Sequence, residues 1–191
     1  SEYYDRIDDL AKRPEDIHGV PTGFIDLDKM LTGLQPSDLL IIAGRPGQGK
    51  TGFLLSIAKN AGLTHKKHVA IFSLEMSRTE ITMRILSAEA TIQLQDLRKG
   101  LKSQDQWNKL ARIMGKISDS PLFIDDSPNM SLMEIRAKCR RLKQQHNLKI
   151  VIIDYLQLMS SGKKVESRQQ EVAEFSRALK LLAKELEVPV I

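Results

Sequence analysis

The stretch GRPGQGKT, residues 44–51, decides how this chain should fold, because it fits the phosphate-binding pattern G-x-x-x-x-G-K-[ST]. It follows the apolar run Leu39–Ala43 and opens the helical pattern Thr51–Ala61. A strand, a glycine-rich loop and a helix in that order form the context that the pattern requires. The glycines let backbone N–H groups face a phosphate, and the helix N-terminus adds positive partial charge. The stretch therefore predicts a nucleotide phosphate site rather than a glycine-rich turn that binds nothing.

The side chains of this loop define the predicted ligands. Lys50 would reach the β- and γ-phosphates of ATP, and Thr51 would hold Mg²⁺. The residues predicted to bind the nucleotide are Gly44, Arg45, Pro46, Gly47, Gln48, Gly49, Lys50, Thr51 and Gly52.

An acidic residue at the end of another apolar run completes the predicted metal site. The run Ile150–Ile153 leads directly to Asp154. Ligands of open α/β sheets bind at that edge, and a buried carboxylate is costly unless it is paired or linked to a metal. We therefore interpret Asp154 as the second residue that holds Mg²⁺, partly through water. Capping of a helix or turn is the alternative.

ATP hydrolysis also needs a carboxylate that polarises the attacking water. Tyr155 follows Asp154, so the general base must come from another strand. Glu75, at the end of the strand Val69–Leu74, is the best placed, and capping of the next helix is its alternative. Glu75 and Lys50 are the predicted catalytic residues. The pair Asp125–Asp126 is predicted to form a turn before Pro128.

Apolar runs alternate with helical patterns over most of the chain, and this alternation predicts an α/β fold: a mostly parallel sheet with helices on both faces. The remaining runs are Leu122–Ile124 and Val188–Ile191, and the remaining helical patterns are Asp26–Leu31, Thr79–Glu89, Gln104–Ile117, Ser131–His146 and Ser167–Glu187. Residues 1–17 are predicted to be a separate helical segment, and residues 18–191 one domain. Because Val188–Ile191 has the pattern of a buried strand with nothing after it, we expect the domain to be incomplete.

The composition excludes several classes of protein. The 191 residues are 41% hydrophobic and 28% charged, which excludes disordered, collagen-like and disulfide-rich chains. No apolar run approaches the roughly 18 residues of a membrane span, so we expect no membrane partner. The single cysteine, Cys139, favours a reducing compartment. The net charge of +5 permits a polyanionic partner without demonstrating one.

Basic residues suggest two candidate contacts with DNA. In the stretch 136–143 we favour a solvated helix face over a DNA track. The loop of residues 160–168 carries Lys163, Lys164 and Arg168, which suit contact with DNA phosphates, with solvent exposure as the alternative. Trp107 is predicted to be buried, because it lies at helical spacing from Leu110.

These features together resemble the C-terminal motor domain of the DnaB-type replicative helicases, which are RecA-like P-loop ATPases. The stretches that carry the resemblance are GVPTGFIDLD (19–28), AGRPGQGKT (43–51), FSLEMS (72–77), RAKCRRLK (136–143), IDYLQLM (153–159) and SRQQEVAEFSRALKLLAKELEVPVI (167–191). The resemblance covers nearly all of residues 18–191. Residues 1–17 resemble the linker of the family, whose helix docks on the adjacent subunit of a ring.

The resemblance implies an ATP-driven homo-hexamer that moves 5′→3′ on single-stranded DNA and meets a primase and a helicase loader. It implies cytoplasmic work at the replication fork, on the nucleoid. By the same resemblance Lys50 and Thr51 hold the phosphates and Mg²⁺, Glu75 is the general base and Asp154 holds Mg²⁺ through water. Arg168, Gln169 and Glu171 then lie in a motif near the subunit interface.

Three elements of the family would lie past Ile191: a glutamine that senses the γ-phosphate, an arginine finger and the main DNA loop. The chain alone should therefore hydrolyse ATP weakly and unwind nothing. Two other functions stay open at this point. One is a RecA-like recombinase or repair ATPase that forms filaments, and the other is a nucleotide-gated scaffold or loader without turnover.

Overall fold

A three-stranded parallel sheet forms the centre of the described part of the chain. The computed structural model describes residues 4–5, 7, 19–42, 49–100, 103–154 and 165–191, with only the backbone described at residues 165–169, 171 and 172. The strands are β1 (Val69–Ser73), β2 (Leu122–Asp125) and β3 (Ile150–Asp154), in the order β2-β1-β3. Both pairings are parallel, so the carboxyl ends of the three strands meet at one edge of the sheet.

Two further segments extend this sheet beyond β3 through single bridges. Val190 bridges in parallel to Val151 of β3 on one side and to Leu39 on the other. The Val190 N–H donates to the Asp38 carbonyl oxygen at 2.8 Å, and the Leu40 N–H donates to the Val190 carbonyl oxygen at 2.9 Å. Both segments were predicted as strands. The segment around Val190 lies beside β3, and the segment around Leu39 lies beside Val190. Each pairing is a single bridge, so neither segment forms a full strand among the described residues.

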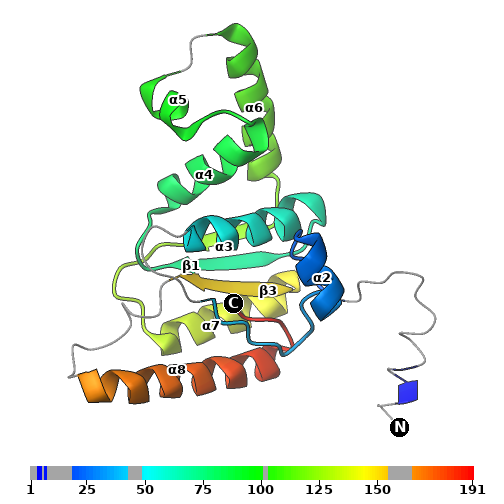
Figure 1. Cartoon of the computed structure of the whole chain (residues 1–191), viewed down its shortest axis with the longest axis vertical. Helices are drawn as coiled ribbons and strands as arrows, with labels where there is room; N and C mark the ends of the chain where they lie inside the picture. The colour runs from blue at the N-terminus through cyan, green and yellow to red at the C-terminus, as the bar shows by residue number, and fades with distance from the viewer. Residues whose placement is uncertain (1–3, 6, 8–18, 43–48, 101–102, 155–164) are drawn as a thin grey trace.

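Helices cover both faces of the sheet, as Figure 1 shows. α3 (Lys50–Lys59) and α4 (Arg78–Ala90) lie on one face, and α7 (Leu132–His146) and α8 (Val165–Leu186) lie on the other. The short α2 (Ile25–Leu31) precedes the sheet, and α5 (Leu94–Lys99) and α6 (Gln104–Ser118) follow α4. The predicted α/β class and the predicted order of elements are confirmed, except that α5 was not predicted.

Alternate residues of the strands face the two layers of helices. Val69 and Ile71 of β1 pack with Ile57 of α3 in one buried cluster. Phe72 of β1 packs with Ile135 of α7 in the other. Because both faces are buried, all five residues of β1 and all five of β3 are inaccessible to solvent or nearly so. This is why the strands are continuous apolar runs in the sequence rather than alternating ones.

A π-helical stretch, η1 (Asn60–Thr64), continues α3 and brings its backbone against β2. A Cβ added to Gly62 would lie 2.5 Å from Cδ2 of Leu122, closer than two carbon atoms can approach. The same stretch holds the preceding loop, since the Asn60 side chain donates to the Pro21 carbonyl oxygen at 3.2 Å. A side chain at position 62 would therefore require the Leu122 side chain to shift, and glycine avoids this where η1 approaches β2.

α4, α5 and α6 project from the sheet and share a small core of their own (Figure 1). The stripe of α6 that faces this core is Leu110, Ile113 and Ile117. The predicted burial of Trp107 is wrong, because its side chain is 51% exposed. Trp107 lies in the first turn of α6, and α5 contributes no buried residue that could cover that turn. Within the described residues no helix is long and apolar enough to cross a membrane.

Candidate nucleotide site

The N-terminus of α3 carries the described part of the predicted phosphate loop. Gly49 precedes the helix with φ at +79°, a left-handed conformation that glycine adopts at little cost. Lys50 and Thr51 are the first two residues of α3. A helix N-terminus attracts a phosphate through its N–H groups and its dipole. The other predicted contacts, Gly44, Arg45, Pro46, Gly47 and Gln48, lie outside the described residues.

Thr51 and Asp154, the two residues predicted to hold Mg²⁺, lie together at the carboxyl edge of the sheet. The Thr51 hydroxyl Oγ1 donates to Oδ2 of Asp154 at 3.3 Å. Asp154 is the last residue of β3, and it is only 6% exposed. A hydroxyl and a carboxylate are oxygen ligands of the kind that Mg²⁺ takes, usually together with phosphate oxygens and water. The donor set present therefore fits the predicted metal ion.

The charges around Asp154 bring two more predicted residues to the same edge. Burial raises the pKa of the Asp154 carboxyl above its ordinary value, while the charge of Lys50 and the Thr51 hydrogen bond act to lower it. The nearby carboxylate of Glu75 raises the pKa of Asp154 further. A bound divalent cation would reverse this balance and favour the ionised carboxylate. Four predicted polar residues thus interact at one edge.

Glu75 lies in the segment that connects β1 to α4, two residues past the end of the strand. Its side chain is exposed. The N-cap of α4 is Ser77, whose hydroxyl accepts from the Glu80 N–H at 3.2 Å. The alternative interpretation of Glu75 as the cap of that helix is therefore wrong, and its role as the general base stays a prediction.

Asp125 forms the turn that the sequence predicted at the end of β2. Its Oδ1 accepts from the Ser127 N–H at 2.9 Å and from the Ser127 hydroxyl at 2.6 Å, and its Oδ2 pairs with Lys138 of α7. Burial opposes ionisation, but the hydrogen bonds from Lys138 and Ser127 outweigh it and place the pKa of Asp125 below its ordinary value. The carboxylate is engaged in structure, which argues against a role as the base.

The basic run on α7 is largely paired within the fold. Arg136 and Arg140 both pair with Glu185 of α8, with exposed fractions near one half for the two arginine side chains. Lys138 pairs with Asp125. The sequence favoured a solvated face, and the exposure agrees, but it gave no signal for these partners because Glu185 lies on another helix. Nothing here supports a DNA track on α7.

The remaining predicted residues lie where side chains are not described. Lys163 and Lys164 fall outside the described residues, and Arg168, Gln169 and Glu171 are described on α8 by their backbone alone. Their roles stay predictions. Within the described chain, no group of three or more His, Cys, Asp and Glu side chains could hold a metal ion. Thr51 and Asp154 stay the residues predicted to hold the cation.

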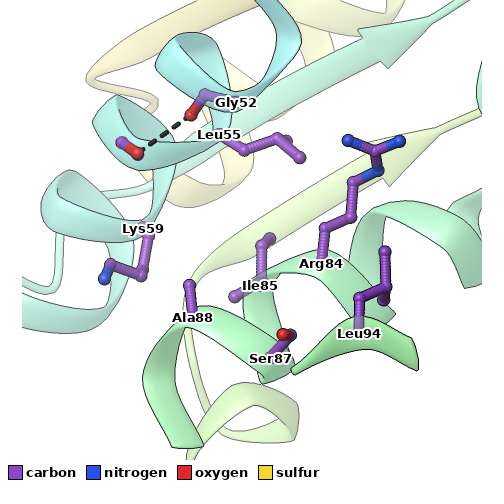
Figure 2. A pocket seen from close by; sticks show the side chains of 9 residues that line it. Gly52, Leu55, Lys59, Arg84, Ile85, Ser87, Ala88 and Leu94 are labelled. Atoms are coloured by element: carbon purple, nitrogen blue, oxygen red, sulfur yellow. Dashed lines mark hydrogen bonds between the residues drawn. The ribbon is translucent and has the colours of Figure 1, made fainter. Parts of the chain in front are cut away.

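A groove of about 260 Å³ lies between α3 and α4, and Gly52 near the start of α3 is one of its lining residues (Figure 2). Figure 2 shows Leu55 and Lys59 of α3 across from Arg84, Ile85, Ser87 and Ala88 of α4, with Leu94 of α5 at its side. Ser56, whose hydroxyl donates to the Gly52 carbonyl oxygen at 2.9 Å, also lines it. Of the predicted nucleotide-binding residues that the structure describes, Gly49 to Gly52, only Gly52 lines the groove.

Comparison with known proteins adds independent findings. A family model for the DnaB-like helicase C-terminal domain matches residues 19–191. The replicative DNA helicase DnaB of Leifsonia xyli subsp. xyli is 58% identical over 187 residues, which cover 98% of this chain and 41% of that protein. The replicative DNA helicase DnaB of Geobacillus stearothermophilus is 52% identical, with 98% and 42% covered. The chain thus spans about two fifths of the length of these relatives.

Solved structures agree with this likeness. A solved ATPase domain superposes with a TM-score of 0.90 at 35% identity, covering 100% of this chain and 68% of the other. A DnaB-like replicative helicase, studied with its interactions with primase, superposes with a TM-score of 0.88 at 35% identity, covering 98% and 47%. These comparisons confirm the predicted RecA-like fold class and the predicted family resemblance.

Proposed function

The chain belongs to the family of DnaB-like helicase C-terminal domains, and on that premise we propose that it is the ATP-driven motor of a replicative DNA helicase. The observation that carries the proposal is the meeting of Thr51 and Asp154 at the carboxyl edge of the sheet, with Lys50 and Glu75 acting on the same carboxylate. The family match favours a helicase over a filament-forming recombinase, and Glu75 favours turnover over a scaffold that only binds ATP.

In the proposed reaction, ATP lies with its phosphates on the N-terminus of α3. Lys50 neutralises negative charge on the β- and γ-phosphates as the bond between them breaks. Glu75 accepts a proton from the water that attacks the γ-phosphorus, and ADP and inorganic phosphate leave. Mg²⁺, held by Thr51 and Asp154, would supply further charge neutralisation at the phosphate oxygens. The assigned nucleotide contacts are Gly44, Arg45, Pro46, Gly47, Gln48, Gly49, Lys50, Thr51 and Gly52.

The finer parts of the function follow from the family alone. We propose a homo-hexameric ring, joined through the predicted linker segment of residues 1–17, that translocates 5′→3′ on single-stranded DNA. Lys163, Lys164 and Arg168 are the proposed DNA contacts. Primase and a helicase loader are the proposed partners, and the cytoplasmic replication fork is the proposed location. One of the similar solved structures concerns a helicase and its interactions with primase, which supports that partner.

The test separates binding of the nucleotide from turnover. Lys50→Ala should abolish binding of a fluorescent ATP analogue in the presence of Mg²⁺, whereas Lys59→Ala is the matched control. Lys59 lies on the same helix but pairs with Glu89 away from the sheet edge. Equal affinity in both variants would contradict the proposal.

Turnover is tested at the proposed base. Glu75→Gln in the full-length protein should preserve affinity for the analogue and lower kcat by about 10²-fold or more. Glu89→Gln, which removes a carboxylate paired with Lys59 and Lys116 at the other end of α4, should leave kcat unchanged. A Glu75→Gln protein with the parent kcat would assign the base to another residue.

A further inference from the structure

Arg78, the first residue of α4, attaches the start of that helix to the end of β2. Its backbone N–H donates to Oδ2 of Asp126 at 2.8 Å. Its guanidinium donates to the Ile124 carbonyl oxygen through Nε at 3.2 Å and through Nη2 at 2.8 Å. Three hydrogen bonds from Arg78 therefore link the N-terminus of α4 to β2 and to the residue that follows it.

The acceptors of these bonds lie on a fixed turn. Asp126 directly follows Asp125, whose carboxylate accepts two hydrogen bonds from Ser127 and pairs with Lys138 of α7. Asp125 is only 6% exposed. Because the turn is held by both its own residues and α7, Asp126 can serve as a rigid anchor for α4.

The segment that runs from β1 to α4 is also attached at its start, to the end of β3. The Leu74 N–H donates to the Asp154 carbonyl oxygen at 2.8 Å, which ties the start of the segment to β3. Met76 is buried, and its N–H donates to the Ser73 hydroxyl at 3.0 Å. Glu75 lies between these two residues and is exposed, in a short segment that is attached to β3 through Leu74 and to the end of β2 through Arg78.

We infer that Arg78 and Asp126 are positioning residues that set the place of the Glu75 carboxylate relative to the phosphate edge. This inference rests on the proposed function, in which Glu75 is the general base. Arg78 acts on it through the backbone three residues away, and Asp126 acts through Arg78. Catalysis is sensitive to such placement, since a shift of about 1 Å at a reacting group can cost about 10²-fold in rate.

Two independent variants test the inference in the full-length protein. Arg78→Ala and Asp126→Ala should each lower kcat for ATP hydrolysis by about 10-fold, with KM and the affinity for an ATP analogue nearly unchanged. Asp126→Asn keeps an oxygen that can accept from the Arg78 N–H, and it should restore most of kcat. Arg98→Ala is the matched control, because Arg98 is an exposed arginine of α5 and belongs neither to this turn nor to the segment from β1 to α4.

Combining variants distinguishes positioning from a loss of stability. In a Glu75→Gln background, Arg78→Ala should cause no further fall in kcat, because the group that it positions no longer acts as a base. An equal fall in both backgrounds, an unchanged kcat in Arg78→Ala, or a failure of Asp126→Asn to restore kcat would each overturn the inference alone. A Glu75→Gln protein with the parent kcat would overturn the base assignment of the proposed function, and this inference with it.

Discussion

Thr51 and Asp154 are joined by a hydrogen bond of 3.3 Å between the hydroxyl Oγ1 and the carboxylate Oδ2, although 103 positions separate them in the chain. Hydrogen bonds from a hydroxyl to an oxygen acceptor usually have oxygen–oxygen distances near 2.7–2.8 Å. At 3.3 Å, the Thr51 hydroxyl therefore stabilises the buried Asp154 carboxylate only weakly. The raised pKa of Asp154 agrees with that assessment. The nucleotide edge thus holds an acidic group that costs stability until a cation binds.

Asp154→Asn should stabilise the nucleotide-free chain at pH 7 by about 0.5–2 kcal/mol, the usual gain from a single stabilising substitution, because it removes a buried charge. The folded chain holds the Asp154 proton up to a higher pH than the unfolded chain, whose carboxyl has the ordinary pKa of 3.8. Stability from this group is therefore present below pH 3.8 and is lost as the pH rises through the folded pKa. Urea unfolding at several pH values should show a gap between the two proteins that widens with pH. A variant less stable than the parent at pH 7 would contradict the prediction.

Lys138→Met should destabilise the chain by about 1–3 kcal/mol at pH 7, because it leaves the Asp125 carboxylate buried without its cation. The pKa of Asp125 is lowered, so the stability that this group contributes is present above pH 3.8 and is lost as the pH falls through the folded pKa. The difference from the parent protein should therefore shrink at low pH. Lys109→Met, at an exposed position of α6, is the control for the same change of side chain. A cost that is the same at pH 7 and at low pH would argue against the ion pair.

Gly62→Ala should destabilise the chain by about 1–3 kcal/mol, the cost of forcing an atom into a packed core. The added Cβ would meet the end of the Leu122 side chain, which would have to shift within the packing between η1 and β2. Gly115→Ala is a matched control on α6, where nothing lies within 4 Å of the added atom. That change should be neutral or stabilising by up to about 1 kcal/mol. Similar melting temperatures for the two variants would show that the close approach at Gly62 is not structurally important.

Cys139 should be unreactive in the folded chain. Its side chain is fully buried, and burial raises the pKa of its thiol to about 12, whereas the thiolate is the reactive form. A thiol-specific reagent at pH 8 should modify the protein slowly in buffer and rapidly in urea. Equal rates under the two conditions would place Cys139 at the surface.

Deletion of residues 1–13 should weaken assembly while leaving the fold and ATP binding intact. Tyr4 and Ile7 in this segment are 75% and 51% exposed, so these apolar side chains are not buried against their own domain. Burial of such side chains on a neighbouring subunit would contribute about 1.5–3 kcal/mol each before ordering costs. Light scattering of the full-length protein with and without the deletion measures the effect. Equal masses at equal concentration would remove the assembly role.

The strands could be predicted from the sequence because burial on both faces leaves a plain signal. β3 is an unbroken apolar run that ends in Asp154. The apolar residues are buried between the two layers of helices, and Asp154 lies at the carboxyl edge of the sheet. α5 could not be predicted in the same way, because none of its residues is buried and no apolar periodicity marks it. Trp107 shows the opposite error, since helical spacing suggested a face that the small core of α4–α6 does not cover.

The site was predictable to the extent that it follows from topology. The meeting of Thr51 with Asp154 follows from the rule that ligands bind at the carboxyl ends of parallel strands. The contacts of Arg78 with β2, and the pair of Asp125 with Lys138, have no such rule behind them. They join charged residues of different elements, and charge pairs leave no periodicity in a sequence. Structure was needed to find them.

The place of Val190 between Leu39 and Val151 has a consequence for the order of folding. Leu39 precedes all three strands of the sheet and Val190 follows them, so this pairing is highly non-local, and pairings of that kind form slowly. During synthesis on the ribosome, the segment that leads into the phosphate loop has to wait for residue 190 before it can join the sheet through this bridge. The bridge between Leu39 and Val190 can therefore form only after β1, β2 and β3, which lie between these two residues in the sequence, have been synthesised.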